Sequence, residues 1–236
     1  MTFFSPLTQT LLDRVFWLPQ EGAVAGPTGR PPNSYAVVGD AGVLLVDAPY
    51  SWAMGAVRGL AERHEPLALV VSHADVMGQG DAFADYAALG VPVLLHPADQ
   101  DDPRSRRAAE GAGVELEDPM EHPALAAVGL EAFHVPGHTP GSVVLWGERG
   151  GGLALAGDSA VGPGPRQDPE PPRLLRPPGP ARIAAFWQRL LSERPVRSVL
   201  PLHGLPYVDR DDMPEIARTL WEGEPMDPTD ASADAR

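Results

Sequence analysis

The stretch LALVVSHADVMGQGD, residues 67–81, changes abruptly from apolar to polar. Its first five residues, LALVV, are typical of a strand that is buried on both faces of a parallel sheet. The polar part begins with Ser72, His73 and Asp75, so it brings polar and ionisable side chains to the end of a buried strand. Functional sites of α/β proteins are commonly built at such strand ends. The stretch therefore predicts an α/β fold with a candidate site after this strand.

Strands and helices are expected to alternate on both sides of this stretch. Two short β-rich runs are joined by GDAG, a turn sequence that indicates a hairpin. Gly90 stands where the C-terminus of a helix commonly needs a left-handed residue. Strands are expected at 36–38, 43–47, 67–71 and 91–96; helices are expected over 52–63, capped by Ser51, and over about eight residues between Asp81, as the N-cap, and Gly90.

The second half of the chain repeats the alternation. Residues 162–180 contain eight Pro and three Gly, which predicts an irregular loop. Residues 1–222 are expected to form a single domain, and the acidic tail 223–236 is expected to be disordered. Strands are expected at 128–135, 142–146, 153–156 and 198–202, and helices at 181–193 and 211–221. This order predicts two sheets with helices outside them.

Composition narrows the chemistry that the chain can perform. Acidic residues outnumber basic ones 32 to 18 and the formal net charge is −14, which argues against a nucleic-acid partner. The chain has no Cys and no Lys, which excludes disulfides, Cys-ligated metals, thiol nucleophiles and lysine-dependent catalysis. Any metal must therefore be held by histidine, carboxylate or carbonyl groups.

Four ionisable residues follow apolar runs in the same way. They are His73 in VVSHAD, His138 in VPGHTPGS, Asp158 in LALAGDSA and His203 in LPLHG. One such histidine alone is more often a capping or solvent-facing residue, whereas four residues in equivalent positions indicate a shared site. Imidazole and carboxylate groups are suitable ligands for zinc, iron or manganese. The pattern therefore predicts a metal site.

These residues belong to a series of motifs that resembles the metallo-β-lactamase superfamily. The motifs are NSY (33–35), LLVDAP (44–49), SHAD (72–75), GHTPGS (137–142), LAGDS (155–159) and LHG (202–204). The segment PGHTPGS is similar to the glyoxalase II and persulfide dioxygenase branches. The resemblance covers about residues 33–205, and it implies a four-layer αββα sandwich with a metal site at one edge.

The resemblance also implies ligand roles for the four residues. His73, His138 and Asp158 match ligands of the family's first metal position. Asp158 also matches the carboxylate that bridges two metals, and His203 matches the last histidine of the second position. The persulfide dioxygenase branch is thought to hold its iron with the His, His and Asp that match the first three residues.

The chain departs from the HxHxDH signature of the family, because it reads HADVMG. Asp75 stands at the second His, Met77 at the Asp and Gly78 at the third His. A thioether is a poor ligand for zinc or a hard cation, and glycine offers no ligand atom. In the family the signature Asp also orients the attacking water, so its loss affects catalysis as well. The resemblance therefore implies a reduced site with at most one tightly bound metal ion.

The expected cofactor is one divalent transition metal, zinc or iron. His73, His138 and Asp158 would be ligands, and Asp75 would be an added ligand or a general base. His203 would be a ligand, or would orient a ligand or the substrate. The leading expectation is hydrolysis of a small ester or thioester by metal-activated water. One alternative is a mononuclear Fe(II) enzyme similar to persulfide dioxygenases, since two His and one carboxylate make a facial triad. Another is a degenerate, metal-free binding module.

The expected partner is a small-molecule substrate, and a homodimer is also open. No apolar segment approaches the ~18–20 residues that span a bilayer, so no membrane partner is expected. The first twenty residues lack the basic start of a signal peptide, and the expected location is the cytoplasm.

The remaining motifs have alternative interpretations. The block GDSA (157–160) superficially resembles the GDSL esterases, but it lies past mid-chain and Leu200 stands where that family needs an Asp before His203. Phe186 and Trp187 are expected to pack in the core. Arginines of the Pro-rich loop would suit either an anionic substrate or a solvated loop; they are Arg166, Arg173 and Arg176. The other histidines are expected at the surface or at strand ends; they are His64, His96, His122 and His134.

Overall fold

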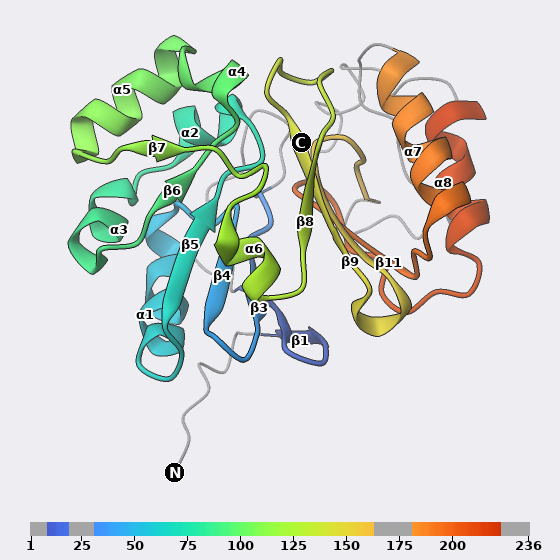
Figure 1. The fold of residues 1–236 in the computed structure, drawn as a ribbon, viewed down its shortest axis with the longest axis horizontal. Coiled ribbons are helices and arrows are strands. Elements are labelled where there is room, and N and C mark those ends of the chain that lie inside the picture. Colours follow the sequence, from blue (N-terminus) through green and yellow to red (C-terminus); the bar gives the residue numbers. More distant parts are fainter. Residues whose placement is uncertain (1–8, 19–30, 163–180, 223–236) are drawn as a thin grey trace, which may run out of the picture.

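The computed structural model describes residues 9–18, 31–162 and 181–222. Within these ranges two β-sheets lie face to face and helices cover their outer faces, as Figure 1 shows. This arrangement confirms the prediction of an αββα sandwich. Most of the Pro-rich loop, with its three arginines, and the acidic tail lie outside the described residues.

The first sheet is antiparallel in its first half and parallel in its second. Its described strands follow chain order: β1 (Gln9–Leu12), β2 (Val15–Trp17), β3 (Tyr35–Val38), β4 (Val43–Val46), β5 (Pro66–Val70), β6 (Val93–Leu94) and β7 (Leu116–Glu117). Strands β3 and β4 form the predicted hairpin, in which Gly39 N donates to Gly42 O at 2.8 Å. From β4 to β7 the pairing is parallel. Parallel neighbours need crossover connections, and helices provide them here.

The helices on this side of the molecule lie in the left half of Figure 1. They are α1 (Met54–Ala61), α2 (Ala74–Gln79), α3 (Phe83–Leu89), α4 (Pro97–Gln100) and α5 (Pro103–Ala112), and a 3₁₀ turn, η1 (Ser51–Ala53), precedes α1. Helix α2 packs on α5, and α3 packs on α5 as well.

The second sheet has the order β11-β10-β9-β8 in the described residues. Its strands are β8 (Glu131–His134), β9 (Val143–Gly147), β10 (Leu153–Gly157) and β11 (Ser198–Pro201). Helices α7 (Ala181–Glu193) and α8 (Met213–Glu222) cover its outer face; a short helix, α6 (Pro123–Ala127), precedes β8, and a 3₁₀ turn, η2 (Arg149–Gly151), joins β9 to β10. Because β8–β9 and β9–β10 pair antiparallel and β10–β11 pair parallel, β8, β10 and β11 run in one direction. Their carboxyl ends therefore meet at one edge.

Three apolar layers hold the sandwich together. In β4, Leu45 packs between the first sheet and its helices, whereas its neighbour Leu44 packs between the two sheets. This alternation is expected because successive side chains of a strand point to opposite faces. The third layer, between the second sheet and α7 and α8, contains Phe186 and Trp187, as predicted.

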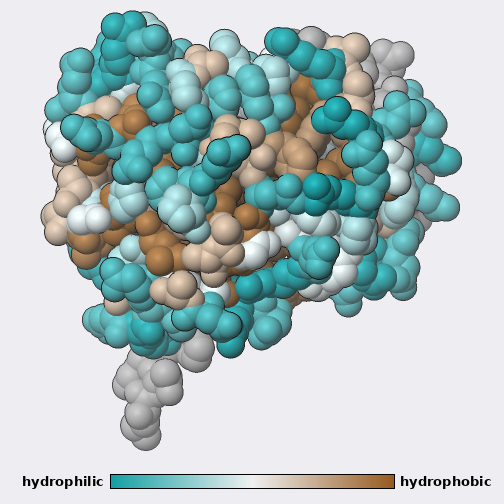
Figure 2. Space-filling view, in the orientation of Figure 1, coloured by the Kyte–Doolittle hydropathy of each residue, from teal (hydrophilic) through white to brown (hydrophobic). Residues whose placement is uncertain are grey.

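The surface of the described residues is largely polar. Figure 2 shows hydrophilic residues on the protruding parts of one face and apolar residues in its recesses. Leu89 is the one large hydrophobic side chain of the described residues that is exposed. No helix in the described part of the chain is long and apolar enough to cross a membrane.

Two predicted helix caps are wrong. Helix α1 begins after Ala53 and α3 after Ala82, and neither has a side-chain cap. Ser51 and Asp81 instead bind each other, because the Asp81 carboxylate accepts hydrogen bonds from Ser51 N at 2.7 Å and Ser51 Oγ at 2.9 Å. A partner distant in the sequence has thus replaced the local backbone donors.

Other boundaries also differ from the prediction. The expected strand 91–96 is reduced to the two residues of β6, and the segment after β5 contains helix α2. Helix α5 was missed because its sequence, PRSRRAAEGA, has few apolar residues to reveal a period, although Asp102 caps it with Pro103 at its first turn. Gly90 has the predicted left-handed conformation, with φ 68°.

Candidate metal centre

His73 lies three residues after β5, at the N-terminus of α2, and is completely buried. Its Nδ1 lies 2.9 Å from Ser72 Oγ, which leaves Nε2 directed toward the second sheet. The two sheets are joined at this point, since Val143 N donates to Ser72 O at 2.9 Å. Gly157 permits this approach, because it has a positive φ of 51° and a Cβ there would lie 2.8 Å from Ser72 Cβ. The strand end that carries Asp158 is thus brought against the strand end that carries His73.

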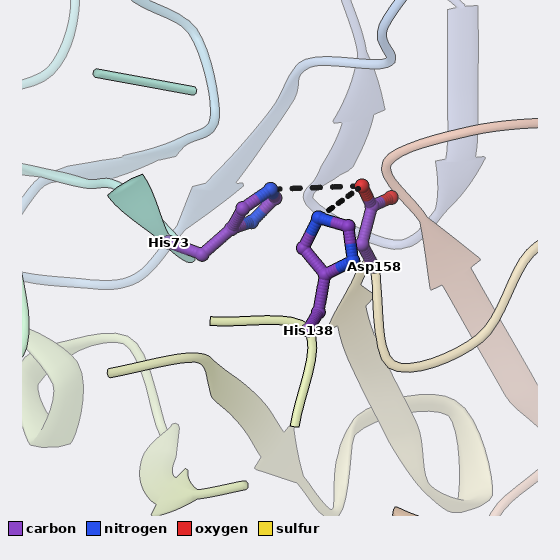
Figure 3. A group of neighbouring side chains, drawn as sticks. All are labelled: His73, His138 and Asp158. Carbon is purple, nitrogen blue, oxygen red and sulfur yellow. Dashed lines mark ion pairs between the residues drawn. The ribbon is translucent and has the colours of Figure 1, made fainter. Parts of the chain in front are cut away.

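His138 and Asp158 complete a compact triad with His73. Asp158 Oδ2 lies 3.5 Å from His73 Nε2 and 3.4 Å from His138 Nε2. Figure 3 shows both imidazole rings pointing toward this carboxylate. The ligand atoms of the three side chains all lie within 4.8 Å of one another. A single ion can therefore be reached by all three groups.

His203 and Asp75, the two remaining predicted residues, also lie at the triad. His203 follows β11 and places Nε2 3.8 Å from Asp158 Oδ2. Asp75 is on α2 and places Oδ2 3.3 Å from His138 Nε2. The structure thus brings together every side chain that the sequence proposed as a ligand.

The protonation states of the cluster suit a cation. Burial lowers the pKa of His73 to about 4, against partial compensation by Asp158, so this imidazole is neutral at pH 7 and can donate a lone pair. The contact with His138 holds the pKa of Asp75 far below its ordinary value, so this carboxylate stays ionised. Burial lowers the pKa of His138, but Asp75 and Asp158 outweigh it and raise the net value. A metal ion binds the neutral form of an imidazole, so a proton and a metal ion would compete for His138.

Buried polar atoms without hydrogen bonds indicate whether the cluster fits a metal ion. Within the described residues, four atoms of the cluster are buried and make no well-oriented hydrogen bond: His73 Nε2, His138 Nε2, Asp158 Oδ1 and His203 Nδ1. Such an atom costs about 1–3 kcal/mol when it is left unsatisfied. Imidazole nitrogens and carboxylate oxygens are the donor set of zinc and iron sites. The residues present therefore fit a divalent transition metal.

The two positions that depart from the family signature do not contribute ligands. Met77 is 1% exposed and belongs to the apolar layer between the first sheet and its helices. Gly78 has no side chain, and the stem of Arg104 lies against it: a Cβ built there would be 3.0 Å from Arg104 Cδ.

Asp99, on α4, positions both histidine-bearing segments and was missed by the sequence analysis. It is 1% exposed. Its Oδ2 accepts from Ala74 N at 2.8 Å, next to His73, and from Thr139 Oγ1 at 2.5 Å, next to His138. Its Oδ1 accepts from Gly141 N at 2.7 Å. The short segment HPADQ around it has no apolar period that could have signalled this role.

Residues of two further motifs fix the segments that carry His203 and His73. In NSY, the Asn33 side chain donates to Pro201 O at 2.9 Å and Gly204 O at 2.6 Å, which fixes the segment of His203. In LLVDAP, Asp47 Oδ1 accepts from Ser72 N at 2.7 Å, beside His73. Burial raises the pKa of Asp47 to about 7.

The other singled-out residues have structural roles. His96 and His122 are the N-caps of α4 and α6, with Nδ1 accepting from Ala98 N and Ala124 N. His134 ends β8, stacks on His96 and donates from Nε2 to Pro140 O. Ser159 of GDSA is buried and donates to Ala156 O at 2.7 Å, so it is not a free nucleophile.

Comparisons with known proteins relate this geometry to a fold. No family model matches the chain. A curated relative, the uncharacterized protein ML0493 of Mycobacterium leprae (strain TN), is 28% identical over an alignment of 147 positions, and the match covers 54% of this chain and 67% of the relative. The crystal structure of TTHA1623, in a di-iron-bound form, is 27% identical with a TM-score of 0.53, and the match covers 78% of this chain and 91% of that one. The DIM-1 metallo-β-lactamase has a TM-score of 0.62 at 14% identity, covering 91% of this chain and 96% of that one.

The chain has the metallo-β-lactamase fold. The fold that the resemblance of the sequence motifs implies is thereby confirmed. The assignment to the glyoxalase II and persulfide dioxygenase branches stays a prediction. In this metallo-β-lactamase fold the candidate metal ligands lie within four residues after β5, β8, β10 and β11, and Asp99 on α4 binds the segments that carry two of them.

Replacing Asp99 with asparagine is expected to lower the free energy of unfolding by about 2–3 kcal/mol, because an amide nitrogen would face buried donors. Zinc affinity is expected to fall about 10–100-fold, as for other residues that orient ligands. Urea denaturation and zinc titration measure the two effects. Asp101→Asn, at a side chain that is 95% exposed, is the control, with a change below about 0.5 kcal/mol. Equal behaviour of the two variants would refute the positioning role.

Proposed function

We propose that this protein is a metal-dependent hydrolase that holds one divalent transition ion, zinc or iron, and acts on a small ester or thioester. The observation that carries the proposal is the convergence of His73, His138 and Asp158, whose ligand atoms lie within 4.8 Å of one another in a largely buried cluster. Three protein ligands with open positions are the composition of catalytic rather than structural zinc sites.

Asp75 and His203, the two residues beside the triad, could have separate roles in hydrolysis. A bound ion would polarise a substrate carbonyl and lower the pKa of a water molecule. Asp75 stays ionised, so it can accept a hydrogen bond from the attacking water and orient it, or add a ligand oxygen. Its low pKa makes it a weak base. His203 lies at the other side of Asp158, where it can orient the substrate or complete the ligand set.

A cavity that is lined by His138, one member of the triad, supports a small-molecule substrate. It has a volume of about 410 Å³ and is lined by His138, Thr139 and Arg182, among others. This volume lies within the range of roughly 300–1,000 Å³ that is common for small-molecule sites.

A mononuclear Fe(II) dioxygenase activity is the second candidate function. The composition of the candidate ligand set is the observation that favours it. Two histidines and one aspartate are the facial-triad set of mononuclear Fe(II) oxygenases. The substrate in that case would be derived from a thiol, as the persulfide dioxygenase resemblance implies.

Chelator-sensitive hydrolysis is the expected result of the test. Protein purified without chelator is assayed with p-nitrophenyl acetate and with an acyl thioester, before and after removal of metal and after zinc is returned. The hydrolase proposal predicts loss of activity with the metal and recovery with zinc. Oxygen uptake with Fe(II) and a persulfide, in the absence of hydrolysis, would favour the dioxygenase. Neither activity, in a folded protein that binds no metal, would favour a binding module.

A further inference from the structure

Arg104 brings a fixed positive charge to the edge of the metal centre. It lies on α5, and its Nη1 donates to Asp75 Oδ1 at 2.5 Å. The other oxygen of Asp75 lies 3.3 Å from His138 Nε2. A single carboxylate therefore joins the guanidinium to the triad.

The guanidinium is held in place before any ligand binds. Asp102 receives Nε at 2.9 Å on Oδ1 and Nη2 at 2.9 Å on Oδ2, a two-point contact that suits the planar fork of arginine. The same carboxylate caps α5 by accepting from Arg104 N at 2.8 Å. The head of Arg104 is thus fixed by two carboxylates, and this arrangement is more rigid than an isolated surface ion pair.

The surface of α2 is shaped to receive this side chain. Asp75 and Gly78 are three residues apart on α2, so they share one face of the helix. At Gly78 a Cβ would lie 3.0–3.3 Å from three carbon atoms of Arg104. A side chain at this position would crowd the arginine stem, whereas glycine lets it cross α2 and reach Asp75.

Both oxygens of Asp75 already have a partner. Oδ1 accepts from Arg104, and Oδ2 faces the imidazole of His138. A second cation that used Asp75 as a ligand would therefore compete with the guanidinium for this carboxylate.

We propose that Arg104 is a positioning residue that takes the place of a second cation: it holds Asp75 at the triad and limits the centre to one divalent ion. This inference rests on the proposed metal-dependent function. It adds the specific claim that a side chain, and not only the absence of ligands at Met77 and Gly78, sets the metal stoichiometry.

The test is a titration of the metal-free protein with Co²⁺, followed by visible absorption, together with elemental analysis after dialysis against zinc. Wild-type protein is expected to saturate at about one ion per chain. Arg104→Met is expected to saturate at about two, because Asp75 is then free to join Asp158 and His203 as a ligand of a second ion. Arg104→Lys keeps the charge and is expected to return the value to one. Arg106→Met is the matched control on the same helix, since Arg106 contacts Asp101 rather than the centre, and it is expected to bind one ion.

The outcomes separate this inference from the function on which it rests. One ion in wild type and still one in folded Arg104→Met would overturn the role of Arg104 and leave the metal centre standing, as would two ions in wild type. No ion in any variant would overturn the proposed function and this inference with it. Arg104→Gln, which removes the charge but keeps a polar planar head, is titrated in parallel. If Arg104→Met does not fold, the number of ions bound by Arg104→Gln tests the role of Arg104 instead. Two ions per chain would support it, and one would overturn it.

Discussion

The His138→Ala variant is expected to lose the thermal stabilisation that metal gives to the wild-type protein. A ligand at a hundredfold excess over its Kd stabilises the folded state by about 2.7 kcal/mol. For a chain of this length that corresponds to a rise in Tm of roughly 5–10 °C. Loss of a ligand is expected to weaken metal binding about 100-fold or more, since loss of an orienting residue alone costs 10–100-fold. At the same metal concentration about 0.4 kcal/mol of stabilisation would then remain, or roughly 1 °C.

Thermal unfolding with and without zinc or Fe(II) measures this loss. The stability of the metal-free protein is expected to change little, because His138 is partly exposed, with 26% of its side chain accessible. His64→Ala is the control, since His64 lies outside the centre and its variant should keep the full metal-induced rise. A metal-induced rise in Tm that survives in His138→Ala would mean that the ion binds elsewhere.

The Met77→Asp variant is expected to lose about 4 kcal/mol or more of its free energy of unfolding. Met77 is 1% exposed and packs in the apolar layer between the first sheet and its helices. A carboxyl group there would lose its hydration, or would be forced to take up a proton, without a matching gain in contacts. Restoring the aspartate of the family signature at this position should therefore damage the fold rather than rebuild a metal position.

Urea denaturation of Met77→Asp beside Met77→Leu tests this expectation. The leucine variant keeps the apolar volume and is expected to cost less than about 1.5 kcal/mol. If Met77→Asp proved as stable as Met77→Leu and bound an additional metal ion, the side chain at this position would face the centre, and the burial of Met77 would not describe the protein in solution.

The candidate ligands of the centre could be predicted from the sequence because each lies within four residues after a strand. His73, His138, Asp158 and His203 follow four such strands, and the directions of β8, β10 and β11 bring three of them to one edge. The strand pattern and the ligand pattern are both local properties of the chain, so both can be read without coordinates.

The residues that position these ligands could not be predicted, because their roles depend on contacts distant in the sequence. Asp99 accepts hydrogen bonds from residues 25 and 42 positions away, and Arg104 reaches Asp75 over 29 positions. The same cause explains the wrong helix caps. Ser51 and Asp81 have the residue types of caps, but they bind each other across 30 positions instead.

The metal content of wild-type protein purified without chelator tests the central claim most directly. Elemental analysis after dialysis is expected to find about one zinc or iron ion per chain, and none in Asp158→Asn prepared in the same way. A folded wild-type protein that holds no metal, and takes up none from excess zinc or Fe(II), would contradict the claim that His73, His138 and Asp158 form a metal centre.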